Sequence, residues 1–321
     1  MSNDIIKATI KALEKEFDGC SILIGDEIRN VGNVISTGSL SLDRALGIGG
    51  LPTGSVVEIY GKPAVGKTTL ALHLIKEAQK QDRLCVFIDS EHALDPQYAE
   101  TLGIDMSNIY ITQPTHAREA LTIMDKLIRT SEVGLVILDS VASLGAEEEQ
   151  KDDVAKPHVA LQARLLSQFL RRNISVIHET DTLVVFINQM RYNISSFFTS
   201  EFTPGGEAIK YYAHVRIFLK ILSQIKGSTG IIGNRISATV TKNKHAFPYK
   251  VAEFDFIFGE GIDTYGEIID LALERGILQR SGSFYKLDDQ KIAQGRENCK
   301  QFLKESEDLV QELIDRIKNE G

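Results

Sequence analysis

Residues 56–78 read VVEIYGKPAVGKTTLALHLIKEA, and this stretch decides the fold. Its first five residues are β-branched or aromatic apart from one glutamate, which favours a strand. Residues 68–78 are rich in Leu, Ala and Lys, which is typical of a helix. The turn between them matches the P-loop pattern G-x-x-x-x-G-K-[ST]. Strand, glycine-rich turn and helix in this order predict a phosphate-binding loop.

This loop is expected to bind the phosphates of a nucleoside triphosphate. Gly61 and Gly66 let backbone N–H groups turn inward around the phosphates, and the helix that follows adds its positive N-terminal dipole. Lys67 is predicted to reach the β and γ phosphates, and the Thr68 hydroxyl to bind Mg²⁺. The predicted nucleotide-binding residues of the loop are Gly61, Lys62, Pro63, Ala64, Val65, Gly66, Lys67, Thr68 and Thr69.

The composition is that of an ordinary globular protein. With 321 residues, 43% of them hydrophobic, the chain can build one or two domains with a sizeable core. The opening stretch MSNDIIKATIKALEKEF mixes charged residues with apolar ones, unlike a secretory signal, and no apolar run approaches membrane-spanning length. We therefore expect a cytoplasmic protein that is not bound to a membrane. Cys20, Cys85 and Cys299 lie far apart without metal-binding spacing, and we expect them to be reduced.

The net charge of −8 is divided unevenly along the chain. Residues 190–250 hold nine Lys or Arg against two Glu, a balance of +7, whereas residues 253–321 hold sixteen Asp or Glu against nine Lys or Arg, a balance of −7. The overall charge argues against a generally basic nucleic-acid binder. The basic central block instead predicts a localised site for a polyanion.

Apolar runs and helical patterns alternate after Gly32. We predict strands at 56–60, 84–89, 135–139 and 183–188 and helices at 68–81, 116–130 and 158–173. This alternation predicts a parallel sheet covered by helices. Strands at 214–222, 235–242 and 250–257 follow without helices between them, which favours antiparallel additions at the sheet edge.

The two ends of the chain are predicted to form separate elements. Ile6, Ile10, Leu13 and Phe17 recur at helical spacing, and so short a helix must pack on its own core or on a neighbouring copy. Beyond Tyr265 we predict a small domain. Its elements are a helix, a hairpin around 281–283, and helices at 291–303 and 307–319.

Polar residues follow three of the predicted strands, where an open α/β sheet binds its ligands. Four apolar residues precede Asp139, the Walker B form, so Asp139 is expected to hold Mg²⁺ through water, with Ser140 beside it. Glu91 is our candidate general base for the attacking water. Gln189 is placed to bond the γ-phosphate and to report the nucleotide state to the segment after it.

Two long segments, 144–157 and 192–206, resist regular structure, and their length favours functional loops. The second carries Phe197, Phe198 and Phe202 between Arg191 and Lys210. Aromatic rings flanked by cations suit single-stranded nucleic acid. Phenylalanines that pack on a partner subunit would explain the pattern equally well, and spacing alone leaves both open.

At this point the sequence resembles a known family, the RecA recombinases of bacteria and their phages, from about residue 36 to 295. The runs that carry the resemblance are ISTGSLSLDRALGIGGLPTGSVVEIYG, FIDSEHALDPQYAETLGID, VILDSVASL, FINQMR and VTKNKHAFP, in this order. The resemblance implies that Glu91 is the catalytic glutamate and Gln189 the γ-phosphate sensor. It implies contacts with the adenine side of ATP from Asp95 and Tyr98.

The same resemblance implies sites shared between subunits and with DNA. Lys242 and Lys244 resemble a pair that reaches the ATP of the neighbouring subunit, where two cations stabilise charge on the phosphoryl group as arginine fingers do. The segments at about 144–158 and 190–206 resemble DNA-binding loops, and the N-terminal helix resembles an arm that packs on the adjacent protomer. The implied DNA-binding residues are Arg164, Arg171, Arg191, Ile194, Phe197, Phe198, Gly205 and Gly206.

Some positions depart from the family pattern. The loop GKPAVGKT stands where GPESSGKT is usual, a change confined to variable positions, so binding is expected to survive although the rate can differ. Glu207 stands where an amide is usual and would repel a DNA phosphate. Phe258 stands where a tyrosine is usual, and Val159 replaces a longer apolar residue.

The expected fold is α/β: a P-loop NTPase core of RecA type at 34–264 with a mostly parallel central sheet, an N-terminal oligomerisation helix and linker at 1–33, and a small α+β C-terminal domain at 265–321. The expected function is that of a DNA-dependent ATPase and homologous recombinase. With ATP and Mg²⁺ it would form helical filaments on single-stranded DNA, pair them with homologous duplex DNA and exchange strands in recombination and DNA repair.

Two alternatives stay open. One is a ring-forming DNA motor or helicase with a RecA core, against which the acidic C-terminal region and the lack of an added helicase module count. The other is a filament-forming regulator that hydrolyses ATP poorly. The presence of Lys67, Thr68, Glu91 and Asp139 argues against the regulator.

Overall fold

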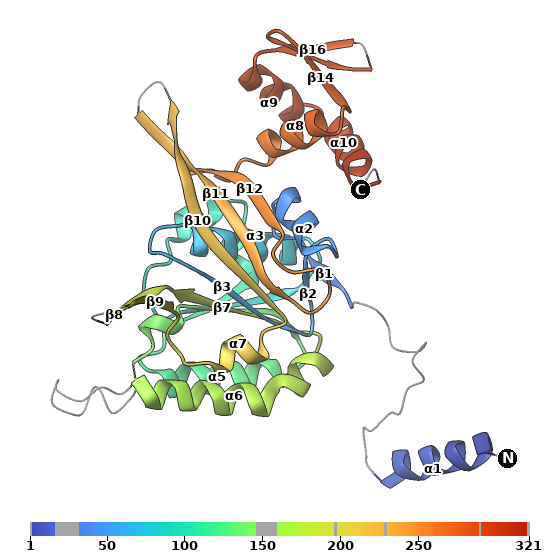
Figure 1. Ribbon diagram of the computed structural model, residues 1–321, viewed down its shortest axis with the longest axis vertical. Coiled ribbons are helices and arrows are strands. Elements are labelled where there is room, and N and C mark those ends of the chain that lie inside the picture. The colour runs from blue at the N-terminus through green and yellow to red at the C-terminus, as the bar shows by residue number, and fades with distance from the viewer. Residues whose placement is uncertain are drawn as a thin grey trace. The chain divides into compact units, whose positions relative to one another are not determined.

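The largest sheet in the described residues has nine strands (Figure 1). The structure is a computed structural model that describes residues 2–16, 32–145, 159–195, 198–227, 230–288 and 290–319. The chain divides into two compact units, Met1–Gly32 and Asn33–Gly321, and the sheet belongs to the second.

The strand order of the sheet is β13-β12-β11-β10-β3-β7-β6-β4-β5. The bounds are β3 Val56–Gly61, β4 Leu84–Asp89, β5 Ile109–Thr112, β6 Val133–Asp139, β7 Leu183–Gln189, β10 Val215–Gly227, β11 Gly230–Asn243, β12 Val251–Ile257 and β13 Gly261–Ile262. The strands from β10 to β5 lie parallel to their neighbours, and β11, β12 and β13 continue the sheet antiparallel. The mostly parallel α/β fold predicted from the sequence is thus confirmed.

Of the three strands predicted as antiparallel additions at the sheet edge, β11 and β12 are antiparallel to their neighbours, but the prediction was wrong for β10. It pairs parallel with β3, from Val215↔Val57 to Leu219↔Gly61. The crossover between β7 and β10 consists of a hairpin and the short helix α7 (Ala208–Tyr212), which the sequence pattern did not reveal.

Helices cover both faces of the sheet (Figure 1). On one face, α3 (Lys67–Gln79) packs on Val57, Ile59 and Phe87, and on the other, α5 (Ala117–Ile128) and α6 (Val159–Glu179) pack on Val56 and Val86. Successive strand residues therefore enter opposite cores, which explains why the strands are apolar throughout. The sequence also did not predict β1 (Val34–Ile35), α2 (Leu40–Leu46), β2 (Leu51–Pro52) and α4 (Pro96–Thr101).

The C-terminal segment has a hydrophobic cluster of its own, which includes Ile268, Tyr285, Leu303 and Leu313. Its elements are α8 Thr264–Glu274, β14 Leu278–Ser281, β15 Phe284–Leu287, β16 Gln290–Gln294, α9 Arg296–Lys304 and α10 Glu307–Asn319. The helix predicted at 291–303 begins only at Arg296, because residues 290–294 pair with β15 and Gly295 turns the chain at φ +86°. The division of the chain at 264/265 stays a prediction.

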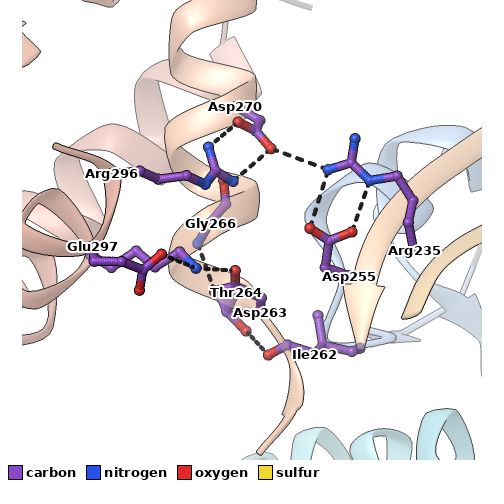
Figure 2. A network of polar contacts seen from close by, with 10 residues as sticks. Arg235, Asp255, Ile262, Asp263, Thr264, Gly266, Asp270, Arg296 and Glu297 are labelled. Carbon is purple, nitrogen blue, oxygen red and sulfur yellow. Dashed lines mark hydrogen bonds and ion pairs between the residues drawn. The ribbon is translucent and has the colours of Figure 1, made fainter. Parts of the chain in front are cut away.

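Ion pairs join this segment to the sheet (Figure 2). Asp270 on α8 accepts hydrogen bonds from Arg296 at 2.5 and 2.9 Å and lies 3.9 Å from Arg235 of β11, which also pairs with Asp255 of β12. The buried carboxylate of Glu267 accepts from Ser39 and from the first N–H groups of α2. Carboxylate and helix N-terminus attract each other, so α8 is fixed against α2.

The segment predicted at 192–206 as irregular contains a two-stranded sheet, so that prediction was wrong for the described residues. Strands β8 (Arg191–Ser195) and β9 (Phe198–Phe202) pair antiparallel, from Arg191↔Phe202 to Ser195↔Phe198. The Thr and Phe residues that suggested a binding loop are also good strand formers. Residues 146–158 of the first predicted loop and Phe197 lie outside the described residues.

In the N-terminal unit, the predicted helix is present as α1 (Ser2–Glu16). Ile6 is exposed, Ile10 and Leu13 are half-buried, and Phe17 and Cys20 lie outside the described residues. Over the part of the chain that the structure describes, every helix is too short or too polar to cross a lipid bilayer.

Replacing buried His73 by glutamine is expected to reduce the loss of stability in acid. Burial, with Lys76 and Lys80 nearby, lowers the pKa of His73 from 6.5 to about 4. As the pH falls from 6.5 towards 4, the unfolded chain binds a proton that the folded protein does not, so His73 loses its stabilising contribution. The free energy of unfolding of the wild type should fall by about 3 kcal/mol more than that of His73→Gln. Urea unfolding at pH 7 and pH 4 tests this, and parallel pH curves would contradict it.

Candidate functional site

A cavity of about 450 Å³ opens at the carboxyl ends of β3, β4, β6 and β7. Sheet register places Gln189 beside Gly61 and Asp139 beside Asp89, so residues far apart in sequence meet here. The cavity is lined by Pro63, Ala64, Val65, Gly66, Lys67, Thr68, Thr69, Glu91, Tyr98, Asp139, Gln189, Asn234, Ile236, Phe256, Ile257, Phe258 and Gly259. Its lining thus includes seven of the nine predicted loop residues, all except Gly61 and Lys62.

The predicted phosphate loop has the backbone such a cradle requires. It joins β3 directly to α3, and Ala64 and Gly66 adopt positive φ values of 59° and 90°. Positive φ values of this kind are typical of loops whose successive N–H groups form a concave anion-binding site. Lys67 is buried and donates to the carbonyl of Lys62 at 2.8 Å, so its ammonium lies within the loop. Burial lowers the pKa of Lys67, and the nearby carboxylates of Asp139 and Glu91 oppose this shift.

Thr68 and Asp139 form a hydroxyl–carboxylate pair at the floor of the cavity. Thr68 Oγ1 donates to Asp139 Oδ2 at 2.5 Å. Burial raises the pKa of Asp139 to about 6; the Thr68 hydrogen bond opposes this shift, and Glu91 adds to it. Asp89 has a different task, since it accepts from the backbone N–H groups of Ala93 and Leu94 and fixes the segment after β4.

The structure brings together three of the predicted site residues, Glu91, Gln189 and Ser140, although Ser140 does not itself line the cavity. Glu91 Oε1 accepts hydrogen bonds from Gln189 Nε2 at 2.8 Å and from Ser140 Oγ at 2.5 Å. The side chains come from the ends of β4, β6 and β7, which lie near one another at the same end of the sheet. A carboxylate held by an amide and a hydroxyl at the cavity wall is arranged to orient a water molecule.

The cavity lining that comes from β11, from β12 and from Tyr98 is mostly apolar, which suits a base. Of the two residues implied for the adenine side, Tyr98 lines the cavity, whereas Asp95 does not. Asp95 instead caps α4 by accepting from the N–H groups of Gln97 and Tyr98, so it positions Tyr98. Sequence reasoning missed the site residues Asn234, Ile236, Phe256, Ile257 and Gly259. Nothing in the local pattern of β11 and β12 distinguishes the first four from ordinary strand residues, and Gly259 lies in the turn between β12 and β13.

Lys242 and Lys244 do not line the cavity of their own chain. Lys242 Nζ donates to the carbonyls of Lys210 and Tyr211, at 2.6 and 2.9 Å, and so covers the end of α7. Burial lowers the pKa of Lys242, and Lys244 and Arg216 add to the effect. Lys244 directly follows β11 and is exposed, and the next residue, His245, is half-buried.

The residues implied for DNA binding are only partly described. Arg164 and Arg171 are exposed on α6, seven residues and two helical turns apart, hence on one face, and Arg191 is exposed at the start of β8. Gly205 and Gly206 adopt φ of 88° and 74°, and a side chain at either position would clash with Leu166 or Ala163 of α6 or with Val141, which follows β6. Ile194 and Phe198 lie in β8 and β9, but their side chains, like Phe197, are outside the described part.

Comparison with known proteins covers nearly the whole chain. A model of the RecA N-terminal domain matches residues 4–263, and one of the RecA C-terminal domain matches residues 266–320. The protein RecA of Campylobacter fetus subsp. fetus is 46% identical over 312 residues, which is 96% of this chain and 90% of that protein. The protein RecA of Arthrobacter sp. is 45% identical over 315 residues, 98% of this chain and 90% of that protein. The chain therefore belongs to the RecA family.

Proposed function

We propose that the protein is a DNA-dependent ATPase and homologous recombinase. It binds ATP, assembles on single-stranded DNA, pairs that strand with homologous duplex DNA and exchanges strands. One observation carries this proposal. Glu91, Gln189 and the Thr68–Asp139 pair line the same cavity as the P-loop residues. Relatives named RecA that match 96 to 98% of the chain do not favour a ring-forming motor or a poorly hydrolysing regulator.

In the proposed reaction, the loop at 61–68 holds the phosphates through its N–H groups, and Lys67 exchanges the Lys62 carbonyl for a phosphate oxygen. Glu91 orients the attacking water and accepts its proton. Gln189 leaves Glu91 to bond the γ-phosphate. Stabilising the spread charge of the transferred group is the main task in phosphoryl transfer.

The chain also offers oxygen ligands that fit Mg²⁺. The Thr68 hydroxyl and the Asp139 carboxylate lie 2.5 Å apart beside the phosphate loop, and Mg²⁺ prefers oxygen ligands, few from protein and the rest from phosphate and water. We propose that these two residues hold the ion, Asp139 through water. When bound, it would neutralise charge on the phosphate oxygens.

The nucleotide site is connected to the proposed DNA site through the end of β7. Gln189 is two residues from Arg191, where β8 begins. Its neighbour Asn188 donates to the carbonyl of Pro204, next to Gly205, and to Glu58. The end of β7 is thus connected to both ends of the β8–β9 hairpin, to β8 through the chain and to the segment after β9 through the Asn188 hydrogen bond. A movement of Gln189 toward a γ-phosphate would pull on the hairpin.

Assembly into a helical filament is part of the proposal. Strand β5 lies at the edge of the sheet in the described residues, and its Tyr110 and Ile111 are 64% and 41% exposed. Unpaired edges with apolar side chains favour contact with another chain. Two further observations agree with contacts between subunits. Ile6 of α1 is exposed, and Lys242 and Lys244 do not line the nucleotide cavity of the chain to which they belong.

The direct test is ATP turnover by the purified protein with and without single-stranded DNA. We expect turnover to be low alone and to rise severalfold on addition of single-stranded DNA, because filament assembly would complete each site. Duplex DNA of the same length serves as the comparison. Turnover that does not increase with single-stranded DNA would overturn the proposal.

A further inference from the structure

The ring of Phe256 lies directly against the phosphate loop. Phe256 belongs to β12, is only 6% exposed, and lines the nucleotide cavity. A Cβ atom placed on Gly66 would stand 2.4 Å from Cε2 and 2.7 Å from Cδ2 of this ring. The ring therefore occupies the space that a side chain at position 66 would need, and Gly66 is the residue before Lys67.

Two contacts prevent the ring from moving away from Gly66. Phe256 packs edge-to-face on Phe254, with ring centroids 5.3 Å apart and an interplanar angle of 84°. Phe256 also pairs with Ile262 of β13, whose N–H donates to Nε2 of buried His73 at 2.9 Å. His73 lies on α3, the helix that begins at Lys67. The β12–β13 hairpin is thus attached to the loop-and-helix unit at two points.

We propose that Phe256 is a positioning residue for ATP: by supporting Gly66, its ring holds the phosphate loop in the conformation that binds phosphates. The inference rests on the proposed function, in which this cavity binds ATP. A loop held in its binding conformation loses less freedom when the ligand arrives, so affinity is higher. A phenyl ring can neither donate nor accept a proton, so the effect falls on nucleotide binding and not on the chemical step.

The test compares Phe256→Leu with Phe254→Leu. Both residues are buried phenylalanines on the same face of β12, and each substitution removes the same ring-to-ring contact. Phe254 does not line the nucleotide cavity, so it is a matched control. The measurements are KM and kcat for ATP with saturating single-stranded DNA, dissociation of a fluorescent ADP analogue, and the melting temperature.

We expect Phe256→Leu to raise KM about three- to tenfold and to speed ADP release by a similar factor, the range that one lost aromatic contact corresponds to. Its kcat at saturating ATP should stay near that of the wild type. Phe254→Leu should lower the melting temperature to a similar degree but change KM and ADP release much less, because it leaves the Phe256 ring beside Gly66 and keeps the pairing of Phe256 with Ile262.

Three results would overturn the inference: an unchanged KM and ADP release in Phe256→Leu, an equal rise in both variants, or a fall in kcat alone. The ADP measurement does not depend on DNA. If wild-type turnover did not respond to single-stranded DNA but Phe256→Leu still released ADP faster, the proposed function would fail and the role of Phe256 would stand.

Discussion

Replacing Glu91 by glutamine should lower DNA-stimulated ATP turnover by about 10²- to 10⁴-fold, the range that general acid–base catalysis contributes. Glutamine has nearly the shape of glutamate and can still accept a hydrogen bond from Ser140, so the cavity should keep its form. It cannot accept the proton of the attacking water. Steady-state turnover with saturating single-stranded DNA is the measurement, and binding of a fluorescent ATP analogue should stay close to that of the wild type.

Glu100→Gln provides the control for this variant. Glu100 is exposed on α4, outside the residues that line the cavity, and the substitution removes the same charge. Its turnover should match the wild type. If Glu91→Gln turned over ATP at the wild-type rate, Glu91 would lose its assigned role, and if it also lost ATP binding, the residue would serve the cavity's structure and not the reaction.

Replacing Lys242 and Lys244 together by alanine should lower DNA-stimulated turnover by about 10³-fold, the lower end of the effect of an arginine finger. The structure provides the physical reason to look between subunits. Neither lysine lines the cavity of its own chain, and Lys242 is held at the end of α7. Full stabilisation of the charge on the phosphoryl group would therefore require a neighbouring subunit that supplies the two cations, in addition to Lys67 of the same chain.

A mixing experiment distinguishes sites shared by two subunits from sites within one chain. Glu91→Gln protomers keep the lysines, and Lys242→Ala/Lys244→Ala protomers keep Glu91. If subunits assemble head to tail, equal amounts of the two inactive variants should form about one quarter intact interfaces and regain about one quarter of wild-type turnover. Turnover that stays at the level of the separate variants would contradict shared sites.

Two controls make the lysine result interpretable. Lys318→Ala removes an exposed lysine from α10 and should leave turnover unchanged. Because Lys242 also covers the carbonyls of α7, the exposed Lys244 is replaced alone as well, and its fall in turnover should occur without a change in melting temperature. Electron microscopy of the double variant on single-stranded DNA should still show filaments.

The parts of the site that depend on local chemistry were predictable from the sequence. The loop at 61–68 is a strand, a glycine-rich turn and a helix in direct succession, so its geometry follows from its own residues. Asp139, Glu91 and Gln189 each follow an apolar run, and in a parallel sheet the ends of such runs meet at one edge. The fold class and the meeting of Glu91 with Gln189 therefore follow from pattern and topology rules.

Other predictions failed where neighbouring strands decide the structure. The sequence pattern predicted a helix from residue 291, yet residues 290–294 form β16 and pair with β15. Gly295, at positive φ, ends β16. The segment with Phe198 and Phe202 read as a loop because its Ser and Thr residues are polar, although β8 and β9 pair across it. Short strands of this kind depend on partners that a single sequence does not specify.

The sequence alone determined that this protein is an α/β chain with a phosphate loop and with a carboxylate and an amide, Glu91 and Gln189, at its strand ends, since those features depend on neighbours in the chain. Only the tertiary structure decided what closes the cavity. Asn234 of β11 and Phe256 of β12 line the cavity. Asp95 does not line it and instead caps α4. The reason is physical: sheet pairing and ring packing bring residues 256 and 66 into contact, and no spacing along the chain encodes a contact across 190 positions.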